Sequence, residues 1–353
     1  MNNKRLAILY SHPGSYTRAC VKALVDGHGW DVLAIHYRKS SEAPFSDEPL
    51  QGIAQCHARD EFTSAQAIVD KVREFGAQVV FMSGWMDKGY LAAAKALRCE
   101  GVKVIAGSDT QWNGSLRQFV AEKIAPWYLH PSIDALWVTG ERQRQFAWRL
   151  GYRGARCWTG MYCCDFHKFD RAAEAAKERG RHFLYVGRYI ERKGIDVLLA
   201  AYQRYRQEAE EPWELHCAGA GEWKSLLAGI DGVNDLGFIQ PESLPQVMAG
   251  AGCFVLPSRV EPWGVVVQEA AAAGLPMICS DAAGAAPHLV RERFNGLTFQ
   301  SESVDELADA MRWIGTKTPD DLERMGQGGR GLAAAYTPEI WARTLMEGVE
   351  NWA

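Results

Sequence analysis

The sequence predicts an α/β protein with two domains, each built on a parallel sheet wrapped by helices. The chain has 353 residues, more than a single hydrophobic core usually supports. Short apolar segments alternate with amphipathic ones along both halves, which is typical of βαβ units. Loops rich in glycine and charged residues follow several apolar segments, and in open α/β sheets such loops line the ligand site. Each half is therefore expected to be a Rossmann-like, nucleotide-binding type of fold.

In the first half, apolar runs of strand length alternate with segments of helical periodicity. The expected strands are Leu6–Tyr10, Asp31–Tyr37, Gln78–Met82, Val102–Ala106 and Ala135–Thr139. The expected helices are Thr17–Asp26, Ser64–Phe75, Gly89–Arg98 and Glu141–Leu150. This alternation predicts one parallel sheet.

The second half repeats the alternation. Its expected strands are His182–Val186, Glu214–Ala218, Val233–Leu236, Cys253–Leu256 and Met277–Ser280. Its expected helices are Ile195–Glu208, Glu222–Leu227, Ser243–Ala249, Val265–Ala273 and Val304–Ile314. A second parallel sheet follows from this order.

The expected domains are residues 1–168, 169–336 and a final helix over 337–353. The joint is placed near residues 165–181, where a charged, alanine-rich segment precedes a new strand. Thr337 is expected to cap the final helix and Pro338 to occupy its first position. The apolar side chains of this helix, Trp341 among them, need a partner surface.

Composition describes an ordinary globular protein, with 47% hydrophobic and 23% charged residues. No apolar run approaches the roughly 20 residues of a membrane span, and no secretory signal precedes the first strand. A cytoplasmic location is therefore expected. The nine cysteines form no CxxC pair. We expect thiols such as Cys217, Cys253 and Cys279 to be free and buried in the core.

Charge is distributed unevenly along the chain. Residues 1–170 hold 21 Lys and Arg against 17 Asp and Glu, whereas residues 171–353 hold 18 against 26. A mildly basic first half could approach an anionic membrane surface or a phosphorylated acceptor. Solvated surface charge is the simpler explanation, because no run of like charges is long. The acidic second half lacks a basic stripe, which argues against nucleic acid as a partner.

The segment from Glu261 to Glu269 places two carboxylates around the start of a helix, with seven residues between them. Gly264 permits close backbone approach at the helix start. The first N–H groups of a helix bind anions such as phosphate, and a carboxylate nearby can accept hydrogen bonds from hydroxyls of the same ligand. A sugar nucleotide has both parts.

Arg188 and Lys193 lie in the loop after the first strand of the second half, within Val186-Gly-Arg-Tyr-Ile-Glu-Arg-Lys-Gly194. The planar fork of an arginine and the point charge of a lysine suit a leaving diphosphate. A solvated basic turn is the alternative for this loop alone. Two further loops, Ala218–Gly221 and Asp235–Ile239, could bring backbone close to a nucleotide, although a short glycine pair is more often a plain turn. All four loops are expected at one edge of one sheet.

These motifs, in this order, resemble the donor domain of retaining glycosyltransferases of family 4. The resemblance is carried by Gly187-Arg188, Lys193-Gly194, Ala218-Gly-Ala-Gly221, Leu236-Gly-Phe-Ile239, Pro257-Ser258, Glu261-x7-Glu269 and Ala273-Gly-Leu-Pro276. It covers about residues 183–300. It implies the GT-B architecture, in which two Rossmann-like domains face a cleft, and a last helix that crosses back onto the first domain.

The resemblance also implies roles for individual residues. Arg188 and Lys193 would bind the donor diphosphate, Glu261 would contact the transferred sugar, and Glu269 would bind the ribose hydroxyls. Backbone around the ligand would come from a further set: Gly14, Gly187, Gly219, Ile239, Trp263, Gly264, Val265 and Val266. Enzymes of this type need no metal, so no metal site and no cofactor beyond the nucleotide-sugar co-substrate are expected.

The acceptor is expected to bind to the first domain. Its candidate residues follow three strands: His12, Trp85, Asp87 and Asp109. Aromatic faces stack on the C–H face of a sugar, and carboxylates accept its hydroxyls. A satisfied strand-end histidine is the favoured alternative for His12, and helix capping is the alternative for both aspartates and the favoured one for Asp87. Many family members carry a histidine near the position of Ser83, which this chain lacks.

The function implied is retaining transfer of a sugar from a nucleotide-diphosphate sugar to a hydroxyl of a glycan or lipid-linked acceptor, as in surface polysaccharide or glycoconjugate biosynthesis. Peripheral association with the inner face of a membrane would accompany a lipid-linked acceptor. Two alternatives share the architecture, a nucleotide-sugar epimerase and a non-catalytic carbohydrate-binding relative. A phosphorylase of the same fold would be much longer and would need a pyridoxal cofactor.

Overall fold

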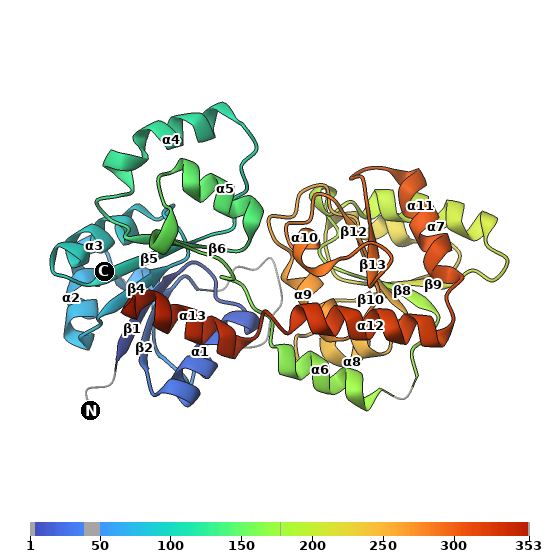
Figure 1. Ribbon diagram of the computed structural model, residues 1–353, viewed down its shortest axis with the longest axis horizontal. Coiled ribbons are helices and arrows are strands. Elements are labelled where there is room, and N and C mark those ends of the chain that lie inside the picture. Colours follow the sequence, from blue (N-terminus) through green and yellow to red (C-terminus); the bar gives the residue numbers. More distant parts are fainter. Residues whose placement is uncertain (1–3, 39–49, 177, 352–353) are drawn as a thin grey trace. The chain divides into compact units, whose positions relative to one another are not determined.

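The computed structural model describes residues 4–38, 50–176 and 178–351, and the chain forms two compact units (Figure 1). Unit 1 contains the described residues up to Cys164 together with those from Tyr336 onward. Unit 2 contains Asp165–Ala335. The first unit therefore combines segments that are far apart in the sequence.

Among its described residues, unit 1 has a seven-stranded parallel sheet in the order β3-β2-β1-β4-β5-β6-β7. The strands are β1 (Arg5–Tyr10), β2 (Asp31–His36), β3 (Gln55–Ala58), β4 (Val79–Met82), β5 (Lys103–Ser108), β6 (Ala135–Val138) and β7 (Cys157–Trp158). The helices are α1 (Ser15–His28), α2 (Ala65–Phe75), α3 (Lys88–Cys99), α4 (Leu116–Tyr128), α5 (Glu141–Arg149) and α13 (Pro338–Glu350).

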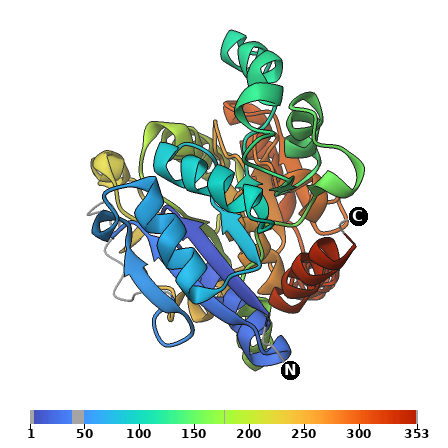
Figure 2. The ribbon, with the colours of Figure 1, turned by 90° about the vertical axis from the view of Figure 1, so that its left-hand side faces the viewer.

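Both faces of this sheet are covered, as parallel sheets require. Because side chains alternate along a strand, β1 sends Leu6 and Ile8 to one core and Ala7 and Leu9 to the other. The first core also contains residues of α1 and α13, whereas the second contains residues of α2, α3 and α5. Figure 2 shows unit 1 from its own side, with helices in front of its strands.

Unit 2 has a six-stranded parallel sheet among its described residues, in the order β10-β9-β8-β11-β12-β13. The strands are β8 (His182–Val186), β9 (Glu214–Ala218), β10 (Val233–Gly237), β11 (Cys253–Leu256), β12 (Met277–Ser280) and β13 (Gly296–Phe299). The helices are α6 (Phe166–Ala175), α7 (Ile195–Glu208), α8 (Leu244–Ala249), α9 (Val265–Ala272), α10 (Ala286–Leu289), α11 (Val304–Gly315) and α12 (Pro319–Ala333). Two parallel-sheet, Rossmann-like domains confirm the predicted fold class.

Several elements differ from the sequence expectation. The segment Glu222–Leu227 is 3-10 helix rather than α-helix, with Trp223 outside helical geometry. Elements without an expected counterpart are β3, β7, β13, α4, α6, α10 and α12. The three strands are short and lie at or next to a sheet edge, so they carry no long apolar run. Helix α12 contains four glycines, which lower helix propensity.

The boundary between the units lies between Cys164 and Asp165, rather than after residue 168. The segment taken as a joint is largely helix α6, whose Phe166 and Phe169 are buried; residue 177 of that segment lies outside the described residues. Helix α6 contacts α8 and α9. Burial of its aromatic residues makes it part of unit 2.

Helix α13 belongs to unit 1 and lies beside α1 (Figure 1). Thr337 caps it by accepting a hydrogen bond from the Ile340 N–H, and Pro338 occupies its first turn, as predicted. The Trp341 ring stacks on Trp137 at 4.8 Å, and its Nε1 donates to the Met161 carbonyl at 2.9 Å. The partner surface of the Trp341 side chain is therefore the core of unit 1.

Candidate active site

The order of strands in unit 2 predicts where a ligand binds. Strands β8 and β11 are neighbours, although the chain reverses direction across the sheet between them. In open α/β sheets, ligands bind at such a switch point, beyond the carboxyl ends of the strands. The loops after β8 and β11 carry the predicted residues Arg188, Lys193, Glu261 and Gly264.

Backbone contacts hold these two loops together. The N–H groups of Arg259 and Val260 both donate to the Arg192 carbonyl, at 2.9 and 3.2 Å. Gly194 has a φ of +67°, and a Cβ there would lie 2.2 Å from the Pro257 carbonyl oxygen. Only glycine satisfies both conditions. The backbones of the loops after β8 and β11 are therefore in direct contact.

A salt bridge joins Lys193 to Glu261 across the switch point. Both side chains are nearly buried, with 16% and 10% of their surfaces exposed. Glu261 is fixed further because its carbonyl accepts from the Gly284 N–H at 3.0 Å, which ties it to the loop after β12. Burying two charges at a sheet edge costs desolvation energy, which only close pairing offsets. A nearly buried ion pair at this position is therefore a candidate functional site.

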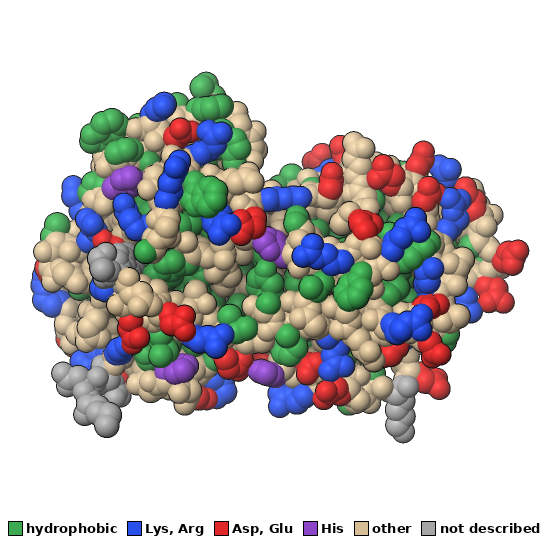
Figure 3. All heavy atoms as spheres, viewed as in Figure 1, with side chains coloured by type: hydrophobic (Ala, Val, Ile, Leu, Met, Phe, Trp, Pro, Cys, Tyr) green, Lys and Arg blue, Asp and Glu red, His purple; other side chains and the backbone are tan. Residues whose placement is uncertain are grey.

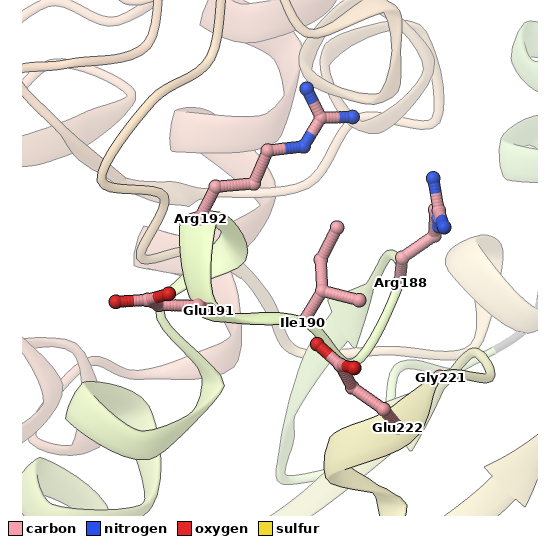
Figure 4. A pocket seen from close by; sticks show the side chains of 6 residues that line it. All are labelled: Arg188, Ile190, Glu191, Arg192, Gly221 and Glu222. Carbon is pink, nitrogen blue, oxygen red and sulfur yellow. The ribbon is translucent and has the colours of Figure 1, made fainter.

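An open pocket of about 420 Å³ lies beside these loops, lined by Arg188, Ile190, Glu191, Arg192, Gly221 and Glu222. Figure 4 shows the side chains of Arg188 and Arg192 extending to the same side, with Glu191 directed away from both. Arg188 is a residue predicted from the sequence, whereas Arg192 was not predicted. Arg192 stands next to Lys193 in the sequence, which was a signal for it. Only the fold shows that both side chains lie at the site.

Glycines bring the backbone of neighbouring loops into contact. A Cβ at Gly219 would lie 1.9 Å from the Gly187 carbonyl oxygen, and one at Gly221 would lie 2.3 Å from that of Tyr189. The predicted residues Gly187 and Gly219 are therefore adjacent. Ile239 follows β10, two strands from β8 in the sheet, and is partly exposed.

Helix α9 begins at the same edge. Its cap residue Gly264 has a φ of +92°, and the first N–H groups of the helix are those of Val265 and Val266. Such groups have no carbonyl partner within the helix. Trp263 is buried, with its ring 5.3 Å from that of His288, and its carbonyl accepts from the Ala285 N–H at 2.9 Å. The helix start is thus held in place from the loop after β12.

Glu269 lies in the second turn of α9 and is only partly exposed. Burial raises the pKa of its carboxyl to about 7, although the positive charge of Lys168 opposes that shift. The carboxyl therefore changes charge near neutral pH. A perturbed acid at a sheet edge is a frequent property of ligand sites.

In unit 1, the loops after β1, β4 and β5 carry the acceptor-side candidates. The Ser11 N–H donates to the Ser83 hydroxyl oxygen at 3.0 Å, so the first two loops touch at the switch point of this sheet. Gly14 is the cap residue of α1, and a Cβ there would lie 2.7 Å from the Tyr16 ring. His12 is exposed, with its ring 6.1 Å from that of Tyr37.

Asp87 is the helix cap that the sequence analysis preferred. Its Oδ1 accepts from the N–H groups of Gly89 and Tyr90, at 2.7 and 3.0 Å. Its Oδ2 accepts from Arg59 at 2.8 Å and from the Tyr37 hydroxyl at 2.7 Å. Burial by itself would raise the pKa of Asp87, but these hydrogen bonds hold it down to about 2. Trp85 is half-buried and packs against the core.

Asp109 has a different environment. It follows β5, and helix α4 is capped by Ser115, so the capping explanation of Asp109 is wrong. The pKa of Tyr16 is raised to about 12, mainly by burial and next by the negative charge of Asp109. Burial also raises the pKa of Tyr162, and the charge of Asp109 contributes there too. The Tyr16 and Tyr162 rings meet edge to face at 5.3 Å. Asp109 therefore lies beside an aromatic pair that the sequence analysis did not identify.

Within the described residues, no group of three or more His, Cys, Asp and Glu side chains could hold a metal ion. The thiols of Cys217, Cys253 and Cys279 are free and buried, as predicted. The adjacent Cys163 and Cys164 are also buried.

Comparison with known proteins gives the same assignment for unit 2. The family described as glycosyl transferases group 1 matches residues 166–331. Unit 2 therefore resembles a glycosyl transferases group 1 domain. The match begins at the first residue of α6, one residue after the start of unit 2, and ends within α12, so the matched segment and unit 2 coincide closely.

Two curated relatives of this domain are mannosyltransferases. The GDP-mannose-dependent alpha-(1-6)-phosphatidylinositol monomannoside mannosyltransferase of Mycobacterium tuberculosis is 32% identical over 164 residues, 42% of each chain. The O-antigen chain mannosyltransferase B of Escherichia coli is 31% identical over 160 residues, 43% of this chain and 40% of the relative. The aligned part is less than half of each of these proteins.

Solved structures resemble the whole chain. A sucrose-phosphate synthase from Thermosynechococcus elongatus has a TM-score of 0.73 at 20% identity, covering 99% of this chain and 98% of the other. A glycosyltransferase from Rickettsia africae has a TM-score of 0.78 at 10% identity, covering 99% and 100%. At these identities the likeness concerns the fold, which is that of GT-B glycosyltransferases.

Proposed function

We propose that the protein is a retaining glycosyltransferase, which moves a sugar from a nucleotide-diphosphate sugar to a hydroxyl of a glycan or lipid-linked acceptor without a metal. The observation that carries this proposal is the nearly buried Lys193–Glu261 pair at the switch point of a domain that resembles glycosyl transferases group 1. An ammonium group can bind a diphosphate and a carboxylate can accept a hydrogen bond from a sugar hydroxyl, so this pair can serve both parts of a donor.

The chemistry assigned to unit 2 is stabilisation of a leaving group. The bond between the sugar anomeric carbon and the diphosphate oxygen breaks, and one to the acceptor oxygen forms on the same face. Arg188, Lys193 and the first N–H groups of α9 offset the negative charge that develops on the diphosphate. A phosphate oxygen accepts the proton of the attacking hydroxyl. Glu261 and Glu269 are assigned to the transferred sugar and the ribose, and neither acts as an acid or base.

Positive charge from side chains supports the metal-independent form of this proposal. Arg188 and Arg192 line one pocket, and Lys193 follows directly in the chain. In many sugar transfers a divalent cation neutralises the diphosphate. Here fixed guanidinium and ammonium groups would take that role, so chelators should leave turnover unchanged.

The test begins with the donor, because the fold leaves the base and sugar open. Thermal unfolding is measured with UDP-, GDP-, ADP- and CDP-sugars, with GDP-mannose included because one relative depends on it. A ligand at about 100 times its dissociation constant stabilises a protein by about 2.7 kcal/mol. The stabilising donor is then incubated with and without acceptors, and products are examined by mass spectrometry and by NMR for anomeric configuration.

The outcomes separate the alternatives. Transfer or slow donor hydrolysis with retained configuration supports the proposal. An epimerised sugar nucleotide in the absence of acceptor would identify an epimerase instead. Donor or glycan binding without any turnover would point to a non-catalytic carbohydrate-binding protein. Surface polysaccharide or glycoconjugate biosynthesis in the cytoplasm, at the membrane face, is the setting proposed for the reaction.

A further inference from the structure

Helix α4 turns its apolar side chains away from unit 1. Leu116, Val120, Ile124 and Trp127 recur at helical spacing and so share one face. Leu116 is 79% exposed and Trp127 is 78% exposed. Helices of globular proteins normally direct such a stripe toward the core. In Figures 1 and 2 this helix lies at the outer end of unit 1, and in Figure 3 hydrophobic side chains gather there beside basic ones.

The inward face of α4 holds the helix in this orientation. Gln118 and Ala125 are its buried residues. The Gln118 side chain accepts from the Asn113 N–H at 2.8 Å and donates to the Gln111 carbonyl at 2.6 Å. Polar contacts with the preceding loop therefore fix the helix, and its apolar stripe remains available to another surface.

The exposed face is also positively charged. Arg117 and Lys123 are exposed on α4, and within the described residues neither forms a salt bridge with a carboxylate. The acidic residue of the helix, Glu122, is paired with Arg149 at 3.2 Å. Lysine, arginine, tryptophan and leucine together on one face are typical of helices that lie in a membrane interface. Tyr128, 44% exposed, adds a second aromatic ring of the kind found at headgroup level.

Among the described residues no helix is long and apolar enough to cross a membrane. With 13 residues, α4 is shorter than the roughly 20 that a span requires. The alternative occupant, the same face of a second copy, would bring Arg117 and Lys123 of two chains together, because a two-fold interface pairs a surface with itself. Like charges at such a contact oppose it.

We propose that the outward face of α4 docks unit 1 onto an anionic lipid bilayer. Leu116, Val120, Ile124 and Trp127 enter the boundary between headgroups and acyl chains, while Arg117 and Lys123 contact anionic headgroups. This docking does not depend on the proposed sugar transfer, since it needs neither donor nor acceptor. The docking proposal can therefore be wrong while the transferase proposal is right, and the transferase proposal can be wrong while the docking proposal is right.

The test is flotation of the full-length protein with two kinds of vesicle, phosphatidylcholine alone and phosphatidylcholine with phosphatidylglycerol. The protein is expected to float with the second kind, and binding should fall as salt is raised, because salt screens the charges. Trp127→Ser combined with Leu116→Ser should weaken partitioning at least tenfold. Arg117→Glu combined with Lys123→Glu should do the same for anionic vesicles.

Two control variants test whether the loss of any exposed aromatic ring or any exposed positive charge weakens vesicle binding. Phe294→Ser removes an exposed aromatic ring of unit 2, and Lys95→Glu reverses an exposed charge on α3. Both should bind vesicles like the unaltered protein. Thermal unfolding of all variants should be unchanged because the altered side chains are exposed.

Three results would overturn the proposal. One is equal, negligible flotation with both kinds of vesicle. Another is a dimer in solution that the α4 variants convert to monomer, since a second copy would then be the occupant. Binding that persists in both α4 variants would place the lipid contact elsewhere and would also contradict it.

Discussion

At the scale of single residues, the pairing of Lys193 with Glu261 decides what a substitution at either position does. Removing one member of a nearly buried ion pair takes the opposite charge away from the other member, whereas removing both members leaves no buried charge of the pair behind. Stability and catalysis can therefore be separated at this pair.

We predict that Lys193→Ala lowers the free energy of unfolding by about 3 kcal/mol and lowers turnover at least about a hundredfold. Adding Glu261→Ala should restore most of the stability and none of the turnover. Chemical denaturation measures the first quantity and steady-state kinetics the second. Near-normal turnover in the single variant would remove Lys193 from the site.

The raised pKa of Glu269 predicts a pH dependence of donor binding. Its carboxyl has a pKa of about 7 in the folded protein against an ordinary value of 4.5. An ionised carboxylate is the better acceptor for ribose hydroxyls, so donor affinity should rise as pH increases through about 7. Glu269→Gln should bind donor more weakly and lose this dependence. Calorimetry between pH 6 and pH 8, about one unit either side, measures both.

The same pKa predicts how stability changes with pH. The folded protein binds this proton more tightly than the unfolded chain does. Its contribution to stability is therefore full below pH 4.5 and is lost as pH rises through about 7. The stability of Glu269→Gln relative to the unaltered protein should increase over that range. Parallel denaturation curves at low and high pH would contradict the assignment.

At the scale of elements, glycines allow the loops of unit 2 to meet. In Gly194→Ala the new residue must adopt a φ of +67°, and its Cβ would lie 2.2 Å from the Pro257 carbonyl oxygen. We expect a loss of about 2 to 5 kcal/mol, the sum of left-handed strain and overpacking, together with loss of donor binding. Gly229→Ala is the matched control, since its φ is +75° and nothing lies within 4 Å. It should cost about 1 kcal/mol and leave donor binding intact.

At the scale of the whole molecule, the last helix completes the first unit. Trp341 stacks on Trp137 and is buried. Trp341→Ala should lower the stability of unit 1 by about 3 to 5 kcal/mol. Trp127→Ala, an exposed tryptophan of the same unit, should change it little. Differential scanning calorimetry would register the difference; equal transition temperatures for the two variants would contradict the packing described for α13.

Much of this structure follows from local patterns in the sequence. The strands β8, β9, β11 and β12 have the predicted bounds, because buried parallel strands are short apolar runs between turn residues. The loops after them carry the motif residues, since carboxyl ends of parallel strands share one edge. Alternation of apolar and polar segments was therefore sufficient to predict two Rossmann-like domains, and the donor site in the second stays a prediction.

Other features depend on contacts between distant residues. The pairing of Lys193 with Glu261, the approach of Arg192 to the pocket and the burial that raises the pKa of Glu269 come from loops that meet only when the sheet forms. Helix α4 was missed because its apolar face points outward and the polar Gln118 points inward. Helix α12 was missed because its glycines are required by close packing, with a Cβ at Gly326 only 2.0 Å from the Gly274 carbonyl oxygen.

The sequence by itself determined the class of fold, the order of the long buried strands of both sheets, and the residue types at the carboxyl edge of the second sheet. Periodicity and turn chemistry act over a few residues, so they can be read without coordinates. Only the tertiary structure decided which charges meet, which side of α4 faces outward and where the last helix packs. Those outcomes depend on burial and on distances between segments far apart in the chain, and no local pattern encodes either.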